Sequence, residues 1–318
     1  MKISETGVGY GEIQLISPYA VHTIHDIRIV QTVNDHAKLY VTGIIPEEKK
    51  DSCLAHTKST DRIELNQVKD GKVVRPLFKG TVSELTIRMV RDIYYMELRA
   101  ISYTFQLDIK QKSRSFQYHA MLYKELVDKI LAEYPGGDAM DHASVSTKLG
   151  KFIVQYKETD WQFLKRMASH FGAVLVPNAT ADSPKFHFGL PEGQKIDLAS
   201  DFYSTAKDIE SYRGTTENGF APHLQENDFL INVVESRQYG NVGDRVTING
   251  KEFVVSQVKA SMKQGMLTYE YGLAIEAGIR QNLIYASSLK GSALKGSVIE
   301  VKKDHVRLHL EMDEAQNK

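Results

Sequence analysis

Two acidic residues near the middle of the chain are the first candidates for chemistry. Glu158 and Asp160 stand two positions apart in the stretch QYKETDWQFLKRMASHFGAVLVPN, residues 155–178. Paired carboxylates can serve as general acid and general base. The same region also fits the start of a helix, because Thr159 and Gln162 form a capping-box pattern and an acid in the first turn suits the helix dipole. We favour the capping interpretation.

Two pairs of histidines are candidates for metal binding. His22 and His25 are three residues apart, and His305 and His309 are four apart. Zinc needs further ligands, and the second pair would have to lie on a helix, whereas residues 306–310 alternate like a strand. We therefore expect surface or turn histidines, with no metal and no cofactor.

Other enzyme motifs are missing or out of context. The glycine-rich run GVGYG, residues 7–11, has neither a strand before it nor a helix after it, so it fails as a dinucleotide fingerprint and predicts an N-terminal arm. The sequence contains no nucleophile elbow, zinc-protease, P-loop or EF-hand pattern. Cys53 is the only cysteine, which excludes a disulfide within one chain and a cysteine-based zinc site.

A basic cluster precedes two aromatic residues in the middle of the chain. Lys110, Lys112 and Arg114 lie just before Phe116 and Tyr118, an arrangement that could bind and stack nucleic-acid bases. The whole chain, however, has 40 basic and 40 acidic residues, whereas nucleic-acid binders usually carry excess positive charge. We interpret this cluster as a solvated linker and expect no nucleic-acid partner.

The N-terminus and the hydropathy bear on location. The first residues, MKISETGVGYGE, lack the apolar core of a signal peptide, and no apolar run approaches the roughly 20 residues that span a bilayer. A single cysteine fits assembly in a reducing cytoplasm. We expect cytoplasmic synthesis, no signal peptide and no membrane insertion by the chain itself.

The elements that position these residues follow from the hydrophobic periodicity. The first hundred residues and the region 228–277 alternate like strands, with hairpin signals at Asp70-Gly71 and Asn249-Gly250. Between these β regions, residues 118–137 predict a helix with one apolar face. The stretch 155–178 predicts strand, capped helix and strand.

The residues predict a mixed, β-rich fold class, with β domains, each a barrel or sandwich, flanking a small α/β domain and the start of another β domain at the C-terminus. Strands without long helices favour a barrel or sandwich, because closure removes exposed edges. The predicted division is 1–110 for the first barrel, 111–195 for the α/β domain, 196–286 for the second barrel, and 287–318 for a linker and the first collar strands.

The central stretch resembles one family, the contractile-tail baseplate hub, which comprises phage late control D proteins and the hub portion of VgrG. The matching residues are Gln155, Tyr156, Glu158, Asp160, Trp161, Phe163, Leu164, Arg166 and Gly172. Residues 113–131 are similar to the aromatic-then-helix approach to this motif. Residues 294–310 are similar to the entry into the OB-fold collar that follows the hub in VgrG.

This resemblance implies a homotrimer. In each subunit, two similar β-barrel domains would flank the small α/β domain, with the start of an OB-like collar at the C-terminus. Six barrels would match a hexameric tail tube, and the three-fold axis would match a trimeric spike. The implied partners are the tube protein, the spike protein and other baseplate proteins, within a bacterial phage, tailocin or injection tail. The chain departs from VgrG because it stops about two strands into the collar, so the spike is expected to be separate or this chain to be a fragment.

The resemblance implies a structural protein rather than an enzyme. The alternative is a tail-associated peptidoglycan hydrolase or another cell-wall-active enzyme, which would need two carboxylates with separated pKa values beside a cleft. We find no acidic pair that helix capping does not already explain. A nucleic-acid binder is the third possibility, and the charge balance disfavours it.

Overall fold

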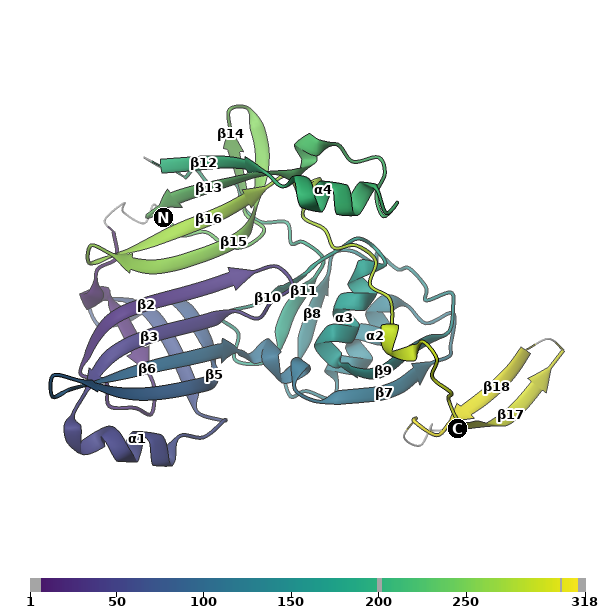
Figure 1. Cartoon of the computed structure of the whole chain (residues 1–318), viewed down its shortest axis with the longest axis horizontal. Helices are drawn as coiled ribbons and strands as arrows, with labels where there is room; N and C mark the ends of the chain where they lie inside the picture. Colours follow the sequence, from purple (N-terminus) through teal and green to yellow (C-terminus); the bar gives the residue numbers. More distant parts are fainter. Residues whose placement is uncertain (1–6, 199–201, 304, 314–318) are drawn as a thin grey trace.

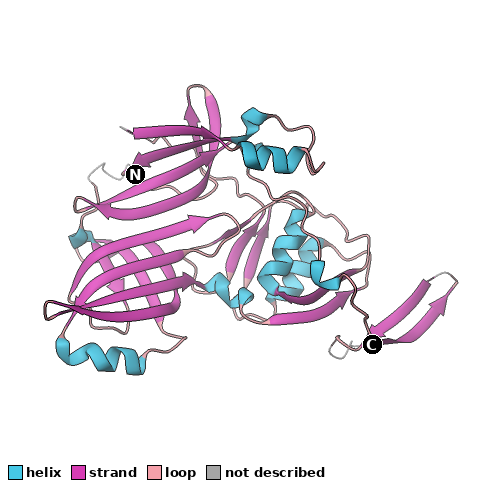
Figure 2. Cartoon of the chain, in the orientation of Figure 1, coloured by secondary structure: helices cyan, strands magenta, loops and turns pink. Residues whose placement is uncertain are grey.

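The computed structural model describes residues 7–198, 202–303 and 305–313. The structure is β-rich, and helices are prominent mainly in its central part (Figure 2). The helices are α1 (Lys50–His56), α2 (Tyr123–Leu131), α3 (Asp160–Ser169) and α4 (Ile209–Thr216). The strands are β1 (Ile13–Ile16), β2 (Thr23–Thr32), β3 (Lys38–Ile45), β4 (Arg62–Lys69), β5 (Lys72–Val90), β6 (Ile93–Ser102), β7 (Gln111–Phe116), β8 (Asp138–Asp141), β9 (Ile153–Thr159), β10 (Leu175–Pro177), β11 (Lys185–Phe188), β12 (Phe202–Lys207), β13 (Leu230–Ser236), β14 (Arg245–Ile248), β15 (Lys251–Lys263), β16 (Met266–Ala274), β17 (Gly296–Lys302) and β18 (His305–Leu310).

Both predicted hairpin turns are present. Asp70 and Gly71 have φ angles of 50° and 73° between β4 and β5. Asn249 and Gly250 have φ angles of 49° and 75° between β14 and β15. Two consecutive positive φ angles are the requirement of a type I′ turn, which explains why these dipeptides predicted the hairpins.

One large sheet joins the two β regions. It has 11 strands in the order β1-β4-β5-β6-β3-β2-β15-β16-β13-β12, with β14 paired to β15. The link is antiparallel pairing of β2 with β15, which runs from Arg28 opposite Ser261 to Thr32 opposite Gln257. Figure 1 shows the two β regions stacked as one continuous curved surface.

The expectation of two closed barrels is corrected by this sheet. No sheet in the described ranges closes on itself. Pairing with β15 satisfies part of the outer edge of β2, so the chain removes this exposed edge without closing the first unit. The strands β1 and β2 stay apart, and a hollow of about 480 Å³ lies between them, lined by residues from Tyr10 to Ile24.

Two main apolar cores hold the structure together. The larger core lies on the large sheet and draws residues from both β regions, together with Val174, Val176 and Ala179. The second core gathers residues between Leu107 and Phe188 beneath α2 and α3. The Asn34 turn, which connects β2 and β3, joins the two parts, because the Asn34 N–H donates to the Leu175 carbonyl at 2.7 Å.

The central α/β part contains two small sheets and two helices. β7 pairs with β9, and β8, β11 and β10 form the other sheet. The helix predicted over 118–137 is present as α2, which is shorter than predicted and spans Tyr123–Leu131. In the described part of the chain, no helix has the length and apolar character needed to cross a membrane.

The C-terminal part is an extended strap followed by a hairpin. Residues 279–289 run along α3, where the Gln281 side chain donates to the Lys165 carbonyl at 2.7 Å and the Ile284 N–H donates to Ser169 Oγ at 2.9 Å. The strands β17 and β18 then project from the body as the predicted antiparallel pair (Figure 1). Asp313 anchors this hairpin to β7, because it accepts hydrogen bonds from the N–H and the hydroxyl of Ser115.

Candidate functional site: the buried polar cluster of the central motif

The start of helix α3 has the capping geometry that the sequence predicts. The Thr159 hydroxyl accepts a hydrogen bond from the Gln162 N–H at 3.2 Å, and the Gln162 side chain accepts one from the Thr159 N–H at 3.1 Å. This reciprocal pair satisfies two N–H groups that a helix start leaves free. The helix leads into Gly172, whose φ of +63° is the left-handed conformation expected after a helix C-terminus.

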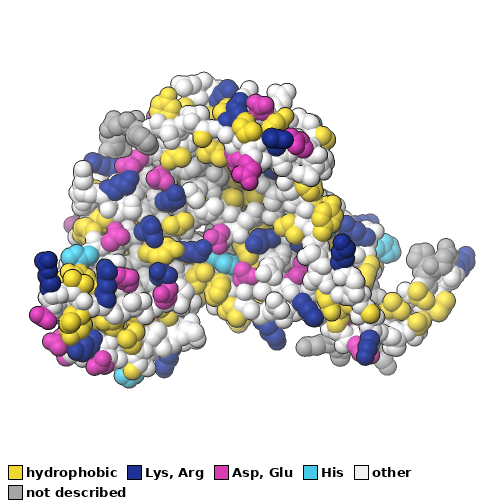
Figure 3. Space-filling view, in the orientation of Figure 1, with side chains coloured by type: hydrophobic (Ala, Val, Ile, Leu, Met, Phe, Trp, Pro, Cys, Tyr) yellow, Lys and Arg dark blue, Asp and Glu magenta, His cyan; other side chains and the backbone are white. Residues whose placement is uncertain are grey.

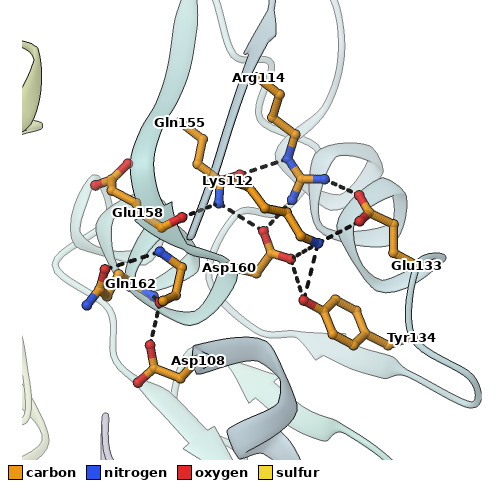
Figure 4. Close-up of polar contacts among 10 residues, drawn as sticks. Asp108, Lys112, Arg114, Glu133, Tyr134, Gln155, Glu158, Asp160 and Gln162 are labelled. Carbon is orange, nitrogen blue, oxygen red and sulfur yellow. Dashed lines mark hydrogen bonds and ion pairs between the residues drawn. The ribbon is translucent and has the colours of Figure 1, made fainter. Parts of the chain in front are cut away.

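Asp160, in the first turn of α3, is also the centre of a buried hydrogen-bond network. Its side chain is fully buried and accepts four hydrogen bonds, two at each oxygen (Figure 4). Oδ1 accepts from Arg114 and from Gln155, the latter at 2.9 Å. Oδ2 accepts from Lys112 and Tyr134, each at 2.6 Å. These five side chains and Glu133 form what we call the Asp160 cluster.

Glu133 balances the charge of the Asp160 cluster. It pairs with Lys112 at 2.6 Å and also with Arg114, while its own side chain is 45% exposed. The cluster therefore holds two cations and two carboxylates, and Glu133 is its most exposed member. Gln155 completes it by accepting from Arg114 Nε at 2.7 Å and donating to the Glu158 carbonyl at 3.0 Å.

The pKa values within the cluster show how firmly the charges are held. Burial by itself would raise the pKa of Asp160, but nearby Arg114 and the hydrogen bonds from Lys112, Tyr134 and Gln155 lower it below the usual aspartate value. Burial, together with the hydrogen bond to Asp160, raises the pKa of Tyr134 to about 12. Asp160 is therefore an anion that neutral pH does not protonate.

A second ion pair lies at the other end of the motif. Arg166 binds Glu158 in a bidentate manner, with Nε at 2.9 Å and Nη2 at 2.7 Å from the two carboxylate oxygens. Nη2 also donates to the Val154 carbonyl at 2.6 Å. Both side chains are largely buried, so this pair ties α3 to β9 through directional contacts.

The apolar residues of the motif fill the second core. Trp161, Phe163 and Leu164 are at most 1% exposed, and the Phe163 ring stacks on Phe116 with centroids 5.7 Å apart. Tyr156 lies on β9, where its carbonyl accepts from Ser288 of the strap at 2.9 Å. The motif residues lie on β9 and α3 and therefore connect the small β7–β9 sheet, the helix and the strap.

A third set of polar contacts links the motif to the large sheet. Trp161 lies against His36 with ring centroids 4.7 Å apart. His36 in turn contacts Asp108, with its Nε2 3.3 Å from Oδ2, and Asp108 accepts from the Thr159 hydroxyl. Burial would raise the pKa of Asp108, but the hydrogen bonds from His36 and Thr159 lower it. This junction fixes α3 relative to the Asn34 turn.

The basic cluster between 110 and 118 is not the solvated linker that we expected. Lys112 and Arg114 lie on β7 and point inward to Asp160, and Phe116 is buried in the second core. Only Lys110 and Tyr118 remain exposed. The set therefore cannot present a row of cations and aromatic rings to nucleic-acid bases.

The candidate catalytic and metal-binding residues do not come together. Asp160 has a lowered pKa and no free lone pair, whereas a general acid needs a raised pKa and access to its substrate. Within the described residues, no group of three or more His, Cys, Asp and Glu side chains could hold a metal ion. His22 and His25 lie near β2, His305 and His309 lie on β18, and Cys53 is buried in α1.

Asp108, Glu133 and Tyr134 were not identified as site residues from the sequence. They come from separate elements, and no spacing rule connects them to Asp160. A weak signal existed in the alternation of Lys112 and Arg114, which suits one face of a strand with an acidic partner.

Comparison with known proteins gives the motif its context. Residues 60–189, which contain the motif and the Asp160 cluster, match the model of the phage tail baseplate hub (GPD) family. No curated protein sequence matches the chain.

Solved structures with low sequence identity share the fold over most of the chain. A 43 kDa tail protein of prophage MuSo2 from Shewanella oneidensis has a TM-score of 0.64 at 8% identity, covering 86% of this chain and 99% of that one. The E. coli c3393 protein, a component of the type VI secretion system with structural similarity to the T4 tail proteins gp27 and gp5, has a TM-score of 0.61 at 14% identity, covering 86% and 80%. A tail protein from Neisseria meningitidis MC58 has a TM-score of 0.59 at 11% identity, covering 85% and 98%.

The match includes β4 to β11, and the buried motif is the part of it that the sequence alone had already singled out. The folds of the solved tail proteins agree with it over most of the remaining chain. Over residues 60–189, the chain is similar to the phage tail baseplate hub family.

Proposed function

We propose that this chain is a structural hub of a contractile injection machine, and that three copies adapt a hexameric tail tube to a trimeric spike. The observation that carries the proposal is the hub-family match over residues 60–189, which includes a motif whose polar residues are committed to internal contacts. A side chain that is saturated by its own chain can hold a scaffold rigid but has no capacity left for a substrate.

The C-terminal hairpin supports an assembled state. On one face of it, Val298, Val301 and Val306 are 59%, 66% and 55% exposed (Figure 3 shows hydrophobic side chains along this hairpin). A two-stranded hairpin is marginally stable alone, and exposed apolar surface marks contact sites. In the proposed trimer, this face meets the other subunits or the spike.

The division of the chain is part of the same proposal. We propose β units at 1–110 and 196–286, an α/β unit at 111–195 and a linker with two collar strands at 287–318, whose outer limits, Met1 and Lys318, lie outside the described residues. The second core, confined to residues between 107 and 188, supports the α/β unit. Three copies with two β units each would present six units to the tube.

Multi-angle light scattering on the purified chain tests the proposal. We expect three times the mass of one chain at micromolar concentration, and a monomer for a variant with Val298, Val301 and Val306 all changed to Lys. A wild-type chain that stays monomeric at high concentration, even with the matching tube and spike proteins added, contradicts the adaptor role. Clearing of purified peptidoglycan by the chain would instead favour the hydrolase.

A further inference from the structure

Two histidines from different strands meet on the small three-stranded sheet. His187 lies on β11, and His142 directly follows β8, which runs parallel to β11. The His142 N–H donates to the Phe188 carbonyl at 2.9 Å, which continues the pairing of the two strands. The ring nitrogens His142 Nε2 and His187 Nδ1 are 2.9 Å apart, and the ring centroids are 5.1 Å apart at 37°.

This contact sets the chemical state of the two rings. A hydrogen bond between two imidazole nitrogens needs a proton on one and a free lone pair on the other, so at least one ring is neutral. A metal ion with metal–nitrogen bonds of 2.0–2.1 Å holds two nitrogens about 3.3 Å apart in tetrahedral geometry and about 3.6 Å apart in trigonal geometry. The observed separation is a few tenths of an ångström shorter, so a metal ion could replace the shared proton after a small ring movement.

A thioether side chain shares the face of the sheet that carries the two rings. Met140 is the direct partner of His187 across the β8–β11 pairing, and it stands two residues before His142. Neighbours across a sheet and residues two apart on a strand share a face, so the three side chains lie on the same side of this sheet. Met140 is 60% exposed, which leaves its thioether accessible.

The face that carries these three residues is separate from the hub motif. Phe186 and Phe188, which flank His187 on β11, point the other way into the second core with Trp161. An ion bound on this outer face would therefore leave the Asp160 cluster intact, and the inference does not depend on the proposed hub function.

We propose that Met140, His142 and His187 form a surface site for a copper(I) ion. Two imidazoles and a thioether are a soft donor set, and soft sulfur ligands favour copper(I) over calcium, magnesium or manganese. No carboxylate belongs to the set, which agrees with the absence of any larger His, Cys, Asp and Glu group in the described residues. The ion would bridge β8 and β11 at the ends of the strands.

Anaerobic competition for copper(I) against bicinchoninate tests the site on the full-length chain. We expect one copper ion per chain, with two nitrogens and one sulfur in the first shell by X-ray absorption. His142→Ala and His187→Ala should each abolish stoichiometric binding. Met140→Leu should remove the sulfur signal and weaken the binding. His22→Ala changes an exposed histidine far along the sequence and serves as the matched control, with circular dichroism confirming that all variants fold.

Three results would overturn the proposal. The wild-type chain could fail to compete for copper(I) at all. One bound copper per chain could persist in the folded His142→Ala and His187→Ala variants, which would place the ion elsewhere. Finally, Met140→Leu could bind copper(I) as tightly as the wild type with the same first shell, which would remove the thioether and with it the preference for a soft ion.

Discussion

The large sheet and the α/β part of this chain place their charges differently. On the large sheet, charged pairs lie at the surface: Arg99 and Glu84 are 2.6 Å apart with side chains 54% and 51% exposed. In the α/β part, Lys112 and Asp160 are also 2.6 Å apart, but they are 17% and 0% exposed. A basic and an acidic side chain thus pair at the surface in one part of the chain and largely inside the protein in the other.

This difference separates two ways of holding a fold. The large sheet is held by backbone hydrogen bonds between its strands and by an apolar core. Apolar burial is favourable whatever the orientation of the side chains. The Asp160 cluster depends on direction, because each hydrogen-bond donor must point at its own lone pair. Loss of one partner leaves a buried charge that nothing compensates. The following substitutions test whether the Asp160 cluster provides such a fixed geometry.

Asp160→Asn should have the largest effect. It removes the anion that Lys112 and Arg114 share, and breaking a buried ion pair in this way typically costs about 3–5 kcal/mol. Urea unfolding followed by tryptophan fluorescence reports on the site directly, because Trp161 is the only tryptophan. Asp35→Asn, which removes the exposed partner of Lys38, is the matched control and should change the stability little. Equal effects of the two substitutions would contradict the contrast drawn above.

Acid should weaken the α/β part through the same carboxylate. The pKa of Asp160 is lower in the folded chain than its ordinary value of 3.8, so its stabilisation is complete above that value and is lost as the pH falls through the folded-state pKa. Asp108 has a lowered pKa and contributes with the same sign. Unfolding midpoints measured from roughly pH 5 downward should therefore fall less steeply in Asp160→Asn than in the wild type. Parallel slopes would show that Asp160 is not linked to the transition.

Gly172→Ala should cost about 1–2 kcal/mol, because a residue with a side chain pays that amount for a left-handed conformation. A Cβ at this position would also lie 2.8 Å from Arg280 Nη2, so the Arg280 side chain, which belongs to the strap, must shift. Thermal unfolding measures the loss. Gly71→Ala is the control, because Gly71 also has a positive φ angle but a Cβ there meets no atom within 4 Å. If both variants lose equal stability, the contact between a Cβ at position 172 and Arg280 does not contribute to the loss.

Thr159→Ala should destabilise the chain by about 1 kcal/mol, the usual cost of losing a helix N-cap. The hydroxyl both caps α3 and donates to Asp108, so the variant also loosens the junction with the large sheet. Thr159→Ser keeps the hydroxyl and should restore most of the stability. Hydrogen exchange of the α3 amides would show the loss locally, and unchanged exchange would argue against the cap.

Arg99→Ala should have the smallest effect. Its partner Glu84 is half exposed, and exposed ion pairs contribute about 0–1 kcal/mol. Chemical denaturation should give nearly the wild-type midpoint, and added salt should not enlarge the difference. A loss comparable with that of Asp160→Asn would mean that surface pairs, too, stabilise the large sheet.

Local rules explain what could be predicted from the sequence. The capping box at Thr159 and the turns at Asp70-Gly71 and Asn249-Gly250 each depend on a few neighbouring residues, and all are present. The buried face of α3 also follows from spacing, because residues three and four apart share a helix face. The family motif was visible for the same reason, since its residues are contiguous.

Long-range contacts decided the rest. The pairing of β2 with β15 joins residues more than two hundred positions apart and turns two expected barrels into one open sheet. The inward orientation of Lys112 and Arg114 depends on Asp160, which is nearly fifty positions away. From the sequence alone, a charged residue is predicted to lie in solvent unless its ion-pair partner is known. Burying a charge is costly unless such a partner is in place. The sequence by itself determined the turns, the caps and the motif, and the tertiary structure alone decided which charges are buried and which sheet edges are paired.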